Sequence, residues 1–276
     1  MTMIDPSARI EPGAMVGQNV SIGPYCIVGA NVAIGDGCRL QAHVRLAGHT
    51  TIGAGTVIYP FASLGSPPQS VKYKGGPTRL VVGSACDIRE SVTMSTGTED
   101  GGGVTAVGDR CFLMAGAHVG HDCHVGSDVT FANNAVLGGH VSVGDRAFLG
   151  GQAAVHQFVR VGEGAMIGGL SGITRDVIPF GFAFGPKAEL VGLNIVGLKR
   201  RGHGRADLHR LRQCYRALFL GGGEFRERLA AVAADYAADP LVGKIIDFLR
   251  AGGSRPPMMP SRVQGGDRAE ATAMHE

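Results

Sequence analysis

The sequence contains no tryptophan, few other aromatic residues and little charge. Among its 276 residues, 6% are aromatic and 18% are charged, and the formal net charge at pH 7 is only +3. No stretch approaches the roughly 18 consecutive apolar residues of a membrane-spanning helix, and the N-terminus lacks the basic start and apolar run of a secretion signal. These absences predict a cytoplasmic protein without a membrane span.

The six cysteines lack the spacing of a metal site or a disulfide scaffold. They include no Cys-x-x-Cys pair and are far sparser than in disulfide-rich domains. Proline is ordinary at 13 residues, so the 45 glycines do not indicate collagen or a Pro/Gly-rich disordered tract. We infer that the thiols are free and that glycine serves a regular structure.

A large apolar residue recurs every six residues. The spacing holds from Ile4 to Leu64 and from Val82 to Met94, and after a one-residue slip it continues from Val107 to Ile173. A small or β-branched residue follows four positions after many of these residues, and glycine often follows directly. This period matches neither a helix nor simple strand alternation, but it is typical of the hexapeptide parallel β-helix. The 26 hexads predict nearly nine triangular coils, stacked about 4.8 Å apart.

The small position of the hexad also explains most of the cysteines. We expect small buried hydrophobic residues there and no catalytic thiol. Cys214 lies outside the repeat. The five cysteines in the small position are Cys26, Cys38, Cys86, Cys111 and Cys123.

Two polar segments interrupt the repeat, at residues 66–79 and 97–103, and should loop out of the prism. Loops on a rigid scaffold often carry binding residues. The sequence predicts a mainly β protein in which a parallel β-helix over residues 1–190 precedes an α-helical domain at 191–250. Residues 251–276 are expected to form a disordered tail.

The helical domain has an amphipathic pattern that begins near Arg205 and ends at the glycines of residues 221–223, and further helices are expected at 224–238 and 241–250. Residues 197–228 contain nine Lys/Arg against three Asp/Glu, which indicates an acidic partner or a solvated helix face. Nucleic acid is not expected as a partner, because stacking aromatics are few and no recognition motif is present.

Histidines gather on one edge of the predicted prism. The coil period of 18 places His121, Gly139 and Gln157 in one column. A lone histidine on such an edge is more often a simple surface residue, but this cluster favours a site. A histidine can accept a proton from an alcohol, a carboxylate can fix its tautomer, and a glycine amide can bind an oxyanion. This set predicts acyl transfer to an alcohol. The neighbouring members of the cluster are Asp122, His140, His156, His118 and His124.

A zinc site is the alternative interpretation of these histidines. His118, His121 and His124 offer suitable ligands, but residues six apart lie on different faces and cannot converge on one ion within a chain. Trimeric hexapeptide-fold carbonic anhydrases assemble zinc sites between subunits, so a trimer of that kind remains a remote alternative. The acyl-transfer interpretation requires no cofactor and no metal.

Five motifs together resemble the UDP-N-acetylglucosamine 3-O-acyltransferases, which begin lipid A biosynthesis. The resemblance implies a left-handed β-helix and a homotrimer with active sites between subunits. It also implies a 3-hydroxyacyl chain delivered by acyl carrier protein and a UDP-sugar acceptor. By resemblance, His121 is the general base, Asp122 orients it, and the Gly139 amide stabilises the oxyanion. The motifs are HDC at 121–123, ANNA at 132–135, GGH at 138–140, AVHQF at 154–158 and NIxGLKRRG at 194–202.

The resemblance assigns further residues to the substrates. Gly169 matches the residue that sets the depth of the acyl pocket, and a glycine there implies a longer chain. Asn194, Arg200 and Arg201 match positions at the nucleotide and carrier end. The other substrate-contacting matches are Gln69, Lys72, His118, His140, His156 and Gln157.

Four positions depart from the family pattern. Ser70 stands where many members have aspartate, Ser95 and Thr96 replace a His-Arg pair, and Val196 replaces a glutamate. These changes leave the base and the oxyanion group intact but concern recognition of the acceptor. An alternative acceptor is therefore the 3-amino analogue of the UDP-sugar, which would give an amide product.

Overall fold

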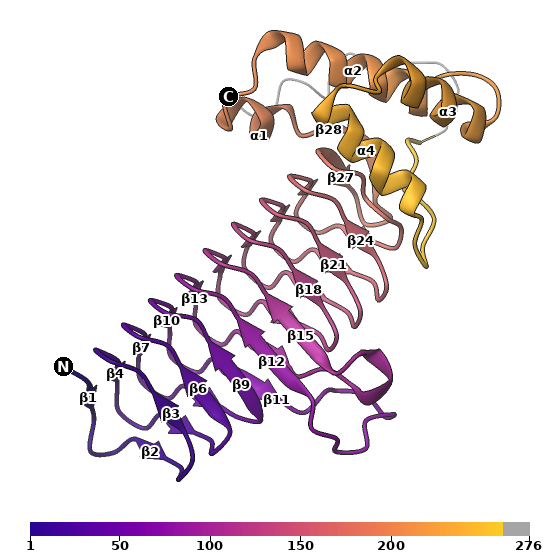
Figure 1. Cartoon of the computed structure of the whole chain (residues 1–276). Coiled ribbons are helices and arrows are strands. Elements are labelled where there is room, and N and C mark those ends of the chain that lie inside the picture. Colours follow the sequence, from indigo (N-terminus) through magenta and orange to yellow (C-terminus); the bar gives the residue numbers. More distant parts are fainter. Residues whose placement is uncertain (262–276) are drawn as a thin grey trace.

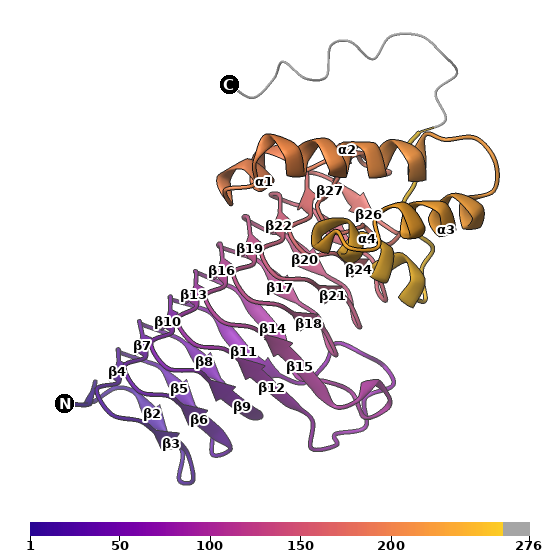
Figure 2. The same ribbon diagram turned by 45° about the horizontal axis from the view of Figure 1, so that its top comes forward.

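The computed structural model describes residues 1–261 of the chain. The chain winds into a left-handed parallel β-helix with three flat faces, and four helices cover its C-terminal end, as Figures 1 and 2 show. All 26 large apolar residues of the predicted hexads lie in the first 26 strands, one in each strand. The hexad prediction is therefore confirmed residue by residue.

Every third strand belongs to the same face, because three hexads complete one coil. The first face, sheet A, ends in one antiparallel pair formed by its last two strands. Its strands are β1 (Met3–Ile4), β4 (Ser21–Ile22), β7 (Arg39–Leu40), β10 (Val57–Ile58), β13 (Asp87–Ile88), β16 (Phe112–Leu113), β19 (Thr130–Phe131), β22 (Phe148–Leu149), β25 (Met166–Ile167), β27 (Gly181–Phe184) and β28 (Glu189–Leu193).

The other two faces are parallel throughout. Sheet B consists of β2 (Arg9–Ile10), β5 (Ile27–Val28), β8 (Arg45–Leu46), β11 (Ser63–Ser66), β14 (Thr93–Ser95), β17 (His118–Val119), β20 (Val136–Leu137), β23 (Ala154–Val155) and β26 (Gly172–Ile173). Sheet C consists of β3 (Met15–Val16), β6 (Val32–Ile34), β9 (His49–Ile52), β12 (Arg79–Val82), β15 (Val104–Val107), β18 (His124–Val125), β21 (Ser142–Val143) and β24 (Arg160–Val161).

The interior of the prism is a continuous apolar column. From Ile22 onward the large residues of the strands are buried inside the prism, and the small residues that precede the strands fill the corners between them, whereas Ile4 in the terminal first coil is 45% exposed. Phe131 is the largest of these side chains and is fully buried. All six cysteines are buried free thiols, and five of them occupy the predicted small inward position.

Four helices follow the last coil: α1 (Ile195–Arg200), α2 (Arg205–Phe219), α3 (Phe225–Asp235) and α4 (Pro240–Ala251). The α2 helix begins at the predicted residue and buries Leu208, Leu211 and Leu218 on one face. The short α1 was not expected from the sequence. Among the described residues, no helix is long and apolar enough to cross a membrane.

The tail expected from residue 251 is wrong in its first part. Met258 is 1% exposed, and its backbone N–H donates to the carbonyl of Asp176 at 2.7 Å. A buried methionine side chain provides the apolar contact that orders this segment. The polar composition around Gly252 and Gly253 concealed this anchor. The rest of the predicted tail, residues 262–276, lies outside the described part of the chain.

The burial of Phe131 yields a first prediction. Phe131→Ala should lower the free energy of unfolding by about 3–5 kcal/mol, because it removes a fully buried ring and leaves a cavity. Urea-induced unfolding of the variant measures this loss. The matched control is Thr130→Ala on the outer side of the same strand, expected to cost less than about 1 kcal/mol. Equal losses for the two variants would contradict the described core.

Candidate active site

One corner of the prism, between sheets B and C, carries most of the predicted site. Both interruptions of the repeat leave from this corner, and residues 120–123, 138–141 and 156–159 turn there in the next three coils. Backbone hydrogen bonds join these turns, since His140 N donates to His121 O at 2.9 Å and Phe158 N donates to Gly139 O at 3.1 Å. The predicted column along this edge is therefore present.

His121 and Asp122 form a hydrogen-bonded pair at this corner. His121 Nδ1 lies 2.8 Å from Asp122 Oδ2, and the side-chain exposure is 19% for the histidine and 0% for the aspartate. Burial alone would raise the pKa of Asp122, but hydrogen bonds from Thr98 and His121 outweigh burial and hold this pKa below its ordinary value. Because an ionised carboxylate only accepts, His121 donates from Nδ1 and keeps Nε2 free as a base.

Gly139 lies against the free edge of the His121 ring. A Cβ on Gly139 would stand 2.4 Å from Cε1 and 2.6 Å from Nε2 of His121, so any larger residue would displace the imidazole. The Gly139 amide has no acceptor among residues 1–261. The Gly139 backbone therefore lies next to the ring edge of His121 that carries Nε2.

His140 closes the other side of the pair. Its ring stacks on Phe158 with centroids 4.4 Å apart, and it meets His121 edge-on at 5.0 Å. His140 Nε2 lies 3.9 Å from Asp122 Oδ2. Burial lowers the pKa of His140, and the Asp122 carboxylate only partly opposes this shift. His140 is thus neutral at neutral pH and can donate or accept a hydrogen bond.

The loop at 97–103 fastens the buried carboxylate. Thr98 donates to Asp122 twice, from its backbone N to Oδ1 at 2.8 Å and from its hydroxyl to Oδ2 at 2.6 Å. Thr105 Oγ1 accepts from the Asp122 backbone N at 2.8 Å. A Cβ on Gly101 would stand 2.2 Å from the Asp122 carboxyl carbon, so the loop packs directly on this group.

The loop at 97–103 also holds the loop at 66–79, which carries Gln69 and Lys72. Glu99 accepts hydrogen bonds from the backbone N of Lys74 at 3.2 Å and of Gly76 at 2.6 Å. The side chains of Gln69 and Lys72 are exposed and make no hydrogen bond or ion pair within the described chain. Thr98 and Glu99 are adjacent in the loop at 97–103. Together they connect the loop that carries Gln69 and Lys72 to the His121–Asp122 pair.

His118, His156 and Gln157 lie beside this centre. His118 projects from sheet B and its Nδ1 lies 2.8 Å from Thr93 Oγ1, and burial together with His121 lowers its pKa. His156 and Gln157 are exposed one coil beyond Gly139. Arg255, from the segment expected to be disordered, contacts both of them.

The remaining predicted residues lie at other places of the same chain. Gly169 is exposed at the corner between sheets A and B. Asn194 caps α1, accepting from Gly197 N at 2.9 Å and donating to Gly164 O at 3.0 Å. Arg200 is exposed, whereas Arg201 packs against Gly164 at the third corner. Burial there lowers the pKa of Arg201, and its Nε and Nη2 have no acceptor within residues 1–261. One chain therefore does not bring all predicted residues together.

The arrangement favours a hydrogen-bonded pair over a metal site. His118 and His124 lie on different sheets and do not converge, as expected. Potential ligand atoms of His121, Asp122 and His140 do lie within 4.8 Å of one another. However, Asp122 Oδ2 already accepts from Thr98 and His121, so an ion would have to displace both donors.

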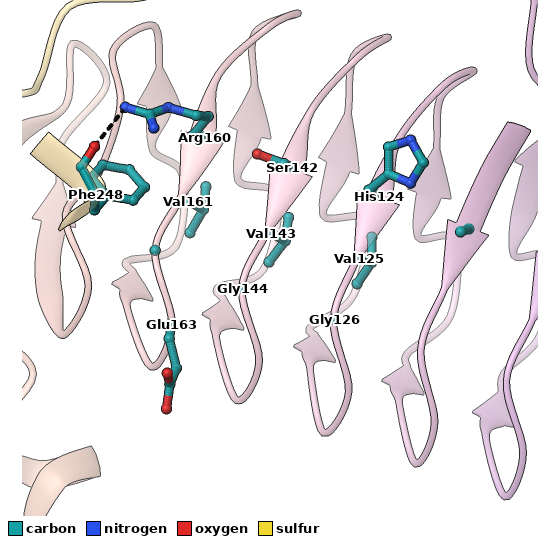
Figure 3. A pocket seen from close by; sticks show the side chains of 12 residues that line it. His124, Val125, Gly126, Ser142, Val143, Gly144, Arg160, Val161, Glu163 and Phe248 are labelled. Carbon is teal, nitrogen blue, oxygen red and sulfur yellow. Dashed lines mark hydrogen bonds between the residues drawn. The ribbon is translucent and has the colours of Figure 1, made fainter. Parts of the chain in front are cut away.

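One hollow of the described chain lies away from this corner. It encloses about 530 Å³ on the outer side of sheet C, where His124, Ser142 and Arg160 stand in a row and Phe248 of α4 closes one end (Figure 3). Of the predicted histidine cluster, His124 alone lines it.

Thr98, Glu99 and Arg255 are functional candidates that sequence reasoning missed. Thr98 and Glu99 lie in a loop already expected to carry function, but no pattern marks which loop residue reaches Asp122. Arg255 lies beyond the repeat and the helices, where no sequence signal indicated a contact.

A β-helix that presents a carboxylate-bound histidine beside a glycine turn defines a hexapeptide-repeat transferase. A model described as bacterial transferase hexapeptide (six repeats) matches residues 1–35, 13–48 and 105–139. A second model, described as UDP N-acetylglucosamine O-acyltransferase, domain 2, matches residues 176–258.

Similar proteins extend over nearly the whole chain. The acyl-[acyl-carrier-protein]--UDP-N-acetylglucosamine O-acyltransferase of Azorhizobium caulinodans is 58% identical over 262 residues, covering 95% of this chain and 97% of that protein. The protein of the same name from Rhizobium etli is 48% identical over 272 residues, covering 96% and 100%.

Solved structures agree with these relatives. The UDP-N-acetylglucosamine O-acyltransferase of Moraxella catarrhalis has a TM-score of 0.89 at 37% identity, covering 92% of this chain and 99% of that one. The UDP-N-acetylglucosamine acyltransferase of Francisella novicida has a TM-score of 0.92 at 31% identity, covering 99% and 100%. This chain belongs to the UDP-N-acetylglucosamine O-acyltransferase family.

The Thr98 contacts yield a second prediction. Thr98→Val should lower the free energy of unfolding by about 1–3 kcal/mol at neutral pH, because a buried carboxylate loses a donor. Since the folded pKa of Asp122 lies below 3.8, its ionised form contributes stability above that pH, and the contribution is lost as the pH falls through the folded pKa. The deficit of the variant should therefore shrink in acid.

Chemical unfolding of both proteins at neutral and acidic pH measures this difference. Thr98→Ser retains the hydroxyl and serves as the control, with a much smaller loss expected at neutral pH. A Thr98→Val deficit that is independent of pH would contradict the proposed link to the Asp122 charge.

Proposed function

We propose that this protein transfers a 3-hydroxyacyl chain from acyl carrier protein to the 3-hydroxyl of UDP-N-acetylglucosamine, the first step of lipid A biosynthesis, in the cytoplasm. The observation that carries the mechanism is the His121–Asp122 hydrogen bond at one corner, with Gly139 next to the Nε2 edge of the His121 ring. Relatives up to 58% identical carry the name of this reaction.

His121 is the general base of the proposed reaction. Its Nε2 accepts the proton of the sugar hydroxyl while the hydroxyl oxygen attacks the thioester carbonyl. Asp122 holds the ring through Nδ1 and stabilises the imidazolium that forms. When the carbon–sulfur bond breaks, the imidazolium returns its proton to the leaving thiolate, and the histidine is neutral again.

The Gly139 N–H stabilises the tetrahedral oxyanion. The amide has no competing acceptor within residues 1–261, and it lies beside the ring edge from which the attack is directed. A preorganised donor of this kind contributes about 10²–10³ in rate in acyl-transfer enzymes. His118, His140, His156, Gln157, Gln69 and Lys72 are the proposed contacts to the two substrates.

The helical domain offers a basic surface to the carrier protein. Acyl carrier protein is acidic, and an acidic partner was expected from the local charge. Arg210 is not available to it, because its guanidinium pairs with Asp207 and Asp239. The exposed basic residues of α1 and α2 are Lys199, Arg200, Arg205, Arg212 and Arg216.

We propose a homotrimer with active sites between neighbouring chains. Gly169 and Arg201 lie at different corners from His121, so a complete site needs them from an adjacent copy. A row of partly exposed apolar side chains on sheet A offers a contact surface. Its members are Phe112, Phe148, Met166 and Phe182. Gly169 would limit the length of the acyl chain from one of these interfaces. Because glycine has no side chain, the pocket would accept a longer acyl chain.

The third prediction tests the reaction itself. Purified protein, incubated with UDP-N-acetylglucosamine and 3-hydroxyacyl carrier proteins of several lengths, should yield acylated sugar by mass spectrometry. His121→Ala should reduce the rate at least about 10³-fold, because it removes the base. Thr51→Ala, an exposed threonine on sheet C that lies outside the proposed contact surface of sheet A, is the matched control. An unreduced rate in His121→Ala would exclude the proposed mechanism, and no product from wild type would exclude the function.

The four departures from the family pattern support a second candidate, in which the acceptor is the 3-amino analogue. Ser95 and Thr96 are buried, and Thr96 Oγ1 accepts from Thr78 at 3.0 Å, so neither supplies the basic side chain of the usual His-Arg pair. Loss of that pair alters the recognition of the acceptor without touching His121.

The fourth prediction decides between the acceptors. With both UDP-sugars at equal concentration, we expect the ester of UDP-N-acetylglucosamine to predominate, as the names of the relatives indicate. Mass spectrometry distinguishes the ester from the amide, and mild alkali should release the acyl chain only from the ester. A predominance of amide would establish the 3-amino sugar as the acceptor instead.

A further inference from the structure

The C-terminal segment of residues 252–259 crosses the end of the β-helix in a fixed position. Asp176 pairs with it through both backbone groups, donating to Pro256 O at 3.0 Å and accepting from Met258 N at 2.7 Å. The Met258 side chain is 1% exposed. Arg255 thus extends from a segment that is anchored directly after it, two coils beyond His121.

The Asp176 anchor is itself held by a buried ion pair. Arg160 Nε donates to Asp176 Oδ2 at 2.7 Å, and the Asp176 side chain is fully buried. Arg160 also donates to the Phe248 carbonyl at 3.2 Å, which ties α4 to the same point. A Cβ on Gly253 would stand 2.7 Å from Asp176 Oδ2, so the segment packs on the pair itself.

Arg255 makes two hydrogen bonds to the predicted substrate residues. Its Nη2 lies 2.9 Å from His156 Nδ1, and its Nε donates to Gln157 O at 3.2 Å. A guanidinium has donors only, so His156 Nδ1 must accept. His156 Nδ1 also lies 3.2 Å from Gln157 O. If Nδ1 carried a proton and donated it to Gln157 O, a donor on His156 would face the donor of Arg255. A neutral imidazole carries one proton, and here that proton lies on Nε2.

We propose that Arg255 is a positioning residue for acyl transfer, which fixes His156 as the Nε2–H tautomer and turns it into a hydrogen-bond donor toward substrate. This inference rests on the proposed function. The exposed Nε2–H lies at the coil after Gly139, where it reaches an oxygen acceptor of a bound substrate rather than the reacting hydroxyl. Such an oxygen belongs either to the UDP-sugar or to the acyl-carrier arm.

Because the donor contacts bound substrate rather than the reacting atoms, its loss should act mainly on KM. We expect Arg255→Met to raise one KM about three- to tenfold, the value of one hydrogen bond, with kcat changed less than about twofold. Separate titration of the two substrates shows which one supplies the oxygen. Arg255→Lys retains one charged donor and should restore part of the effect. Ser254→Ala, an exposed neighbour in the same segment, is the matched control.

A double-mutant cycle separates positioning from a merely structural role. If Arg255 acts through His156, the double variant Arg255→Met/His156→Ala should be no worse than His156→Ala alone. Additive effects of the two changes, or no effect of Arg255→Met on either KM, would overturn the proposal. A fall in thermal stability beyond that of Ser254→Ala, with both KM values unchanged, would assign Arg255 to folding alone.

A second measurement does not depend on activity. In protein labelled with ¹⁵N-histidine, the resonances that disappear in His156→Ala should show a proton on Nε2 and none on Nδ1, and Arg255→Met should mix the two tautomers. A proton on Nδ1 in wild type would overturn the inference. If wild type forms no acylated sugar, the proposed function fails, while these spectra still decide the tautomer.

Discussion

The parallel hydrogen-bond ladder between coils is the constraint on which the rest of this structure depends. Each strand is only two to five residues long and bonds only to the coil before and the coil after it. A strand of this length has no stability of its own, so its position is set by the 18-residue repeat of its neighbours. Residues that share a place in successive coils are therefore stacked, and a column in the sequence becomes an edge of the prism.

That stacking explains how the His121–Asp122 pair is held in place. His121, Gly139 and Gln157 come from three coils, yet backbone bonds between the turns fix their spacing. The demanding feature is the buried Asp122 carboxylate, whose pKa burial alone would raise. Thr98 supplies two donors that keep the carboxylate ionised, and the loop that carries Thr98 is a departure from the repeat at the same corner. The regular coils fix the positions of these residues, and the irregular loop supplies the hydrogen bonds that stabilise the Asp122 carboxylate.

The repeat itself could be predicted from the sequence because every coil poses the same local packing problem. One large and one small inward residue per hexad identified all 26 strands, and the period placed the His121 column on one edge. The corner residues Asp122, His140 and Phe158 all have positive φ, between 58° and 67°, yet nothing in their side chains indicates this conformation. Only the geometry of the closed coil imposes it.

The sequence by itself determined the β-helix, its interruptions and the edge of the prism on which His121 lies, because these follow from a period that every coil repeats. The tertiary structure alone decided which loop residues touch Asp122, that Arg201 turns inward against Gly164, and that Arg255 reaches His156. These contacts join segments far apart in the sequence, such as those of Arg255 and His156, which are 99 positions apart. No local pattern encodes such a pair, because its formation depends on where the whole chain places both ends.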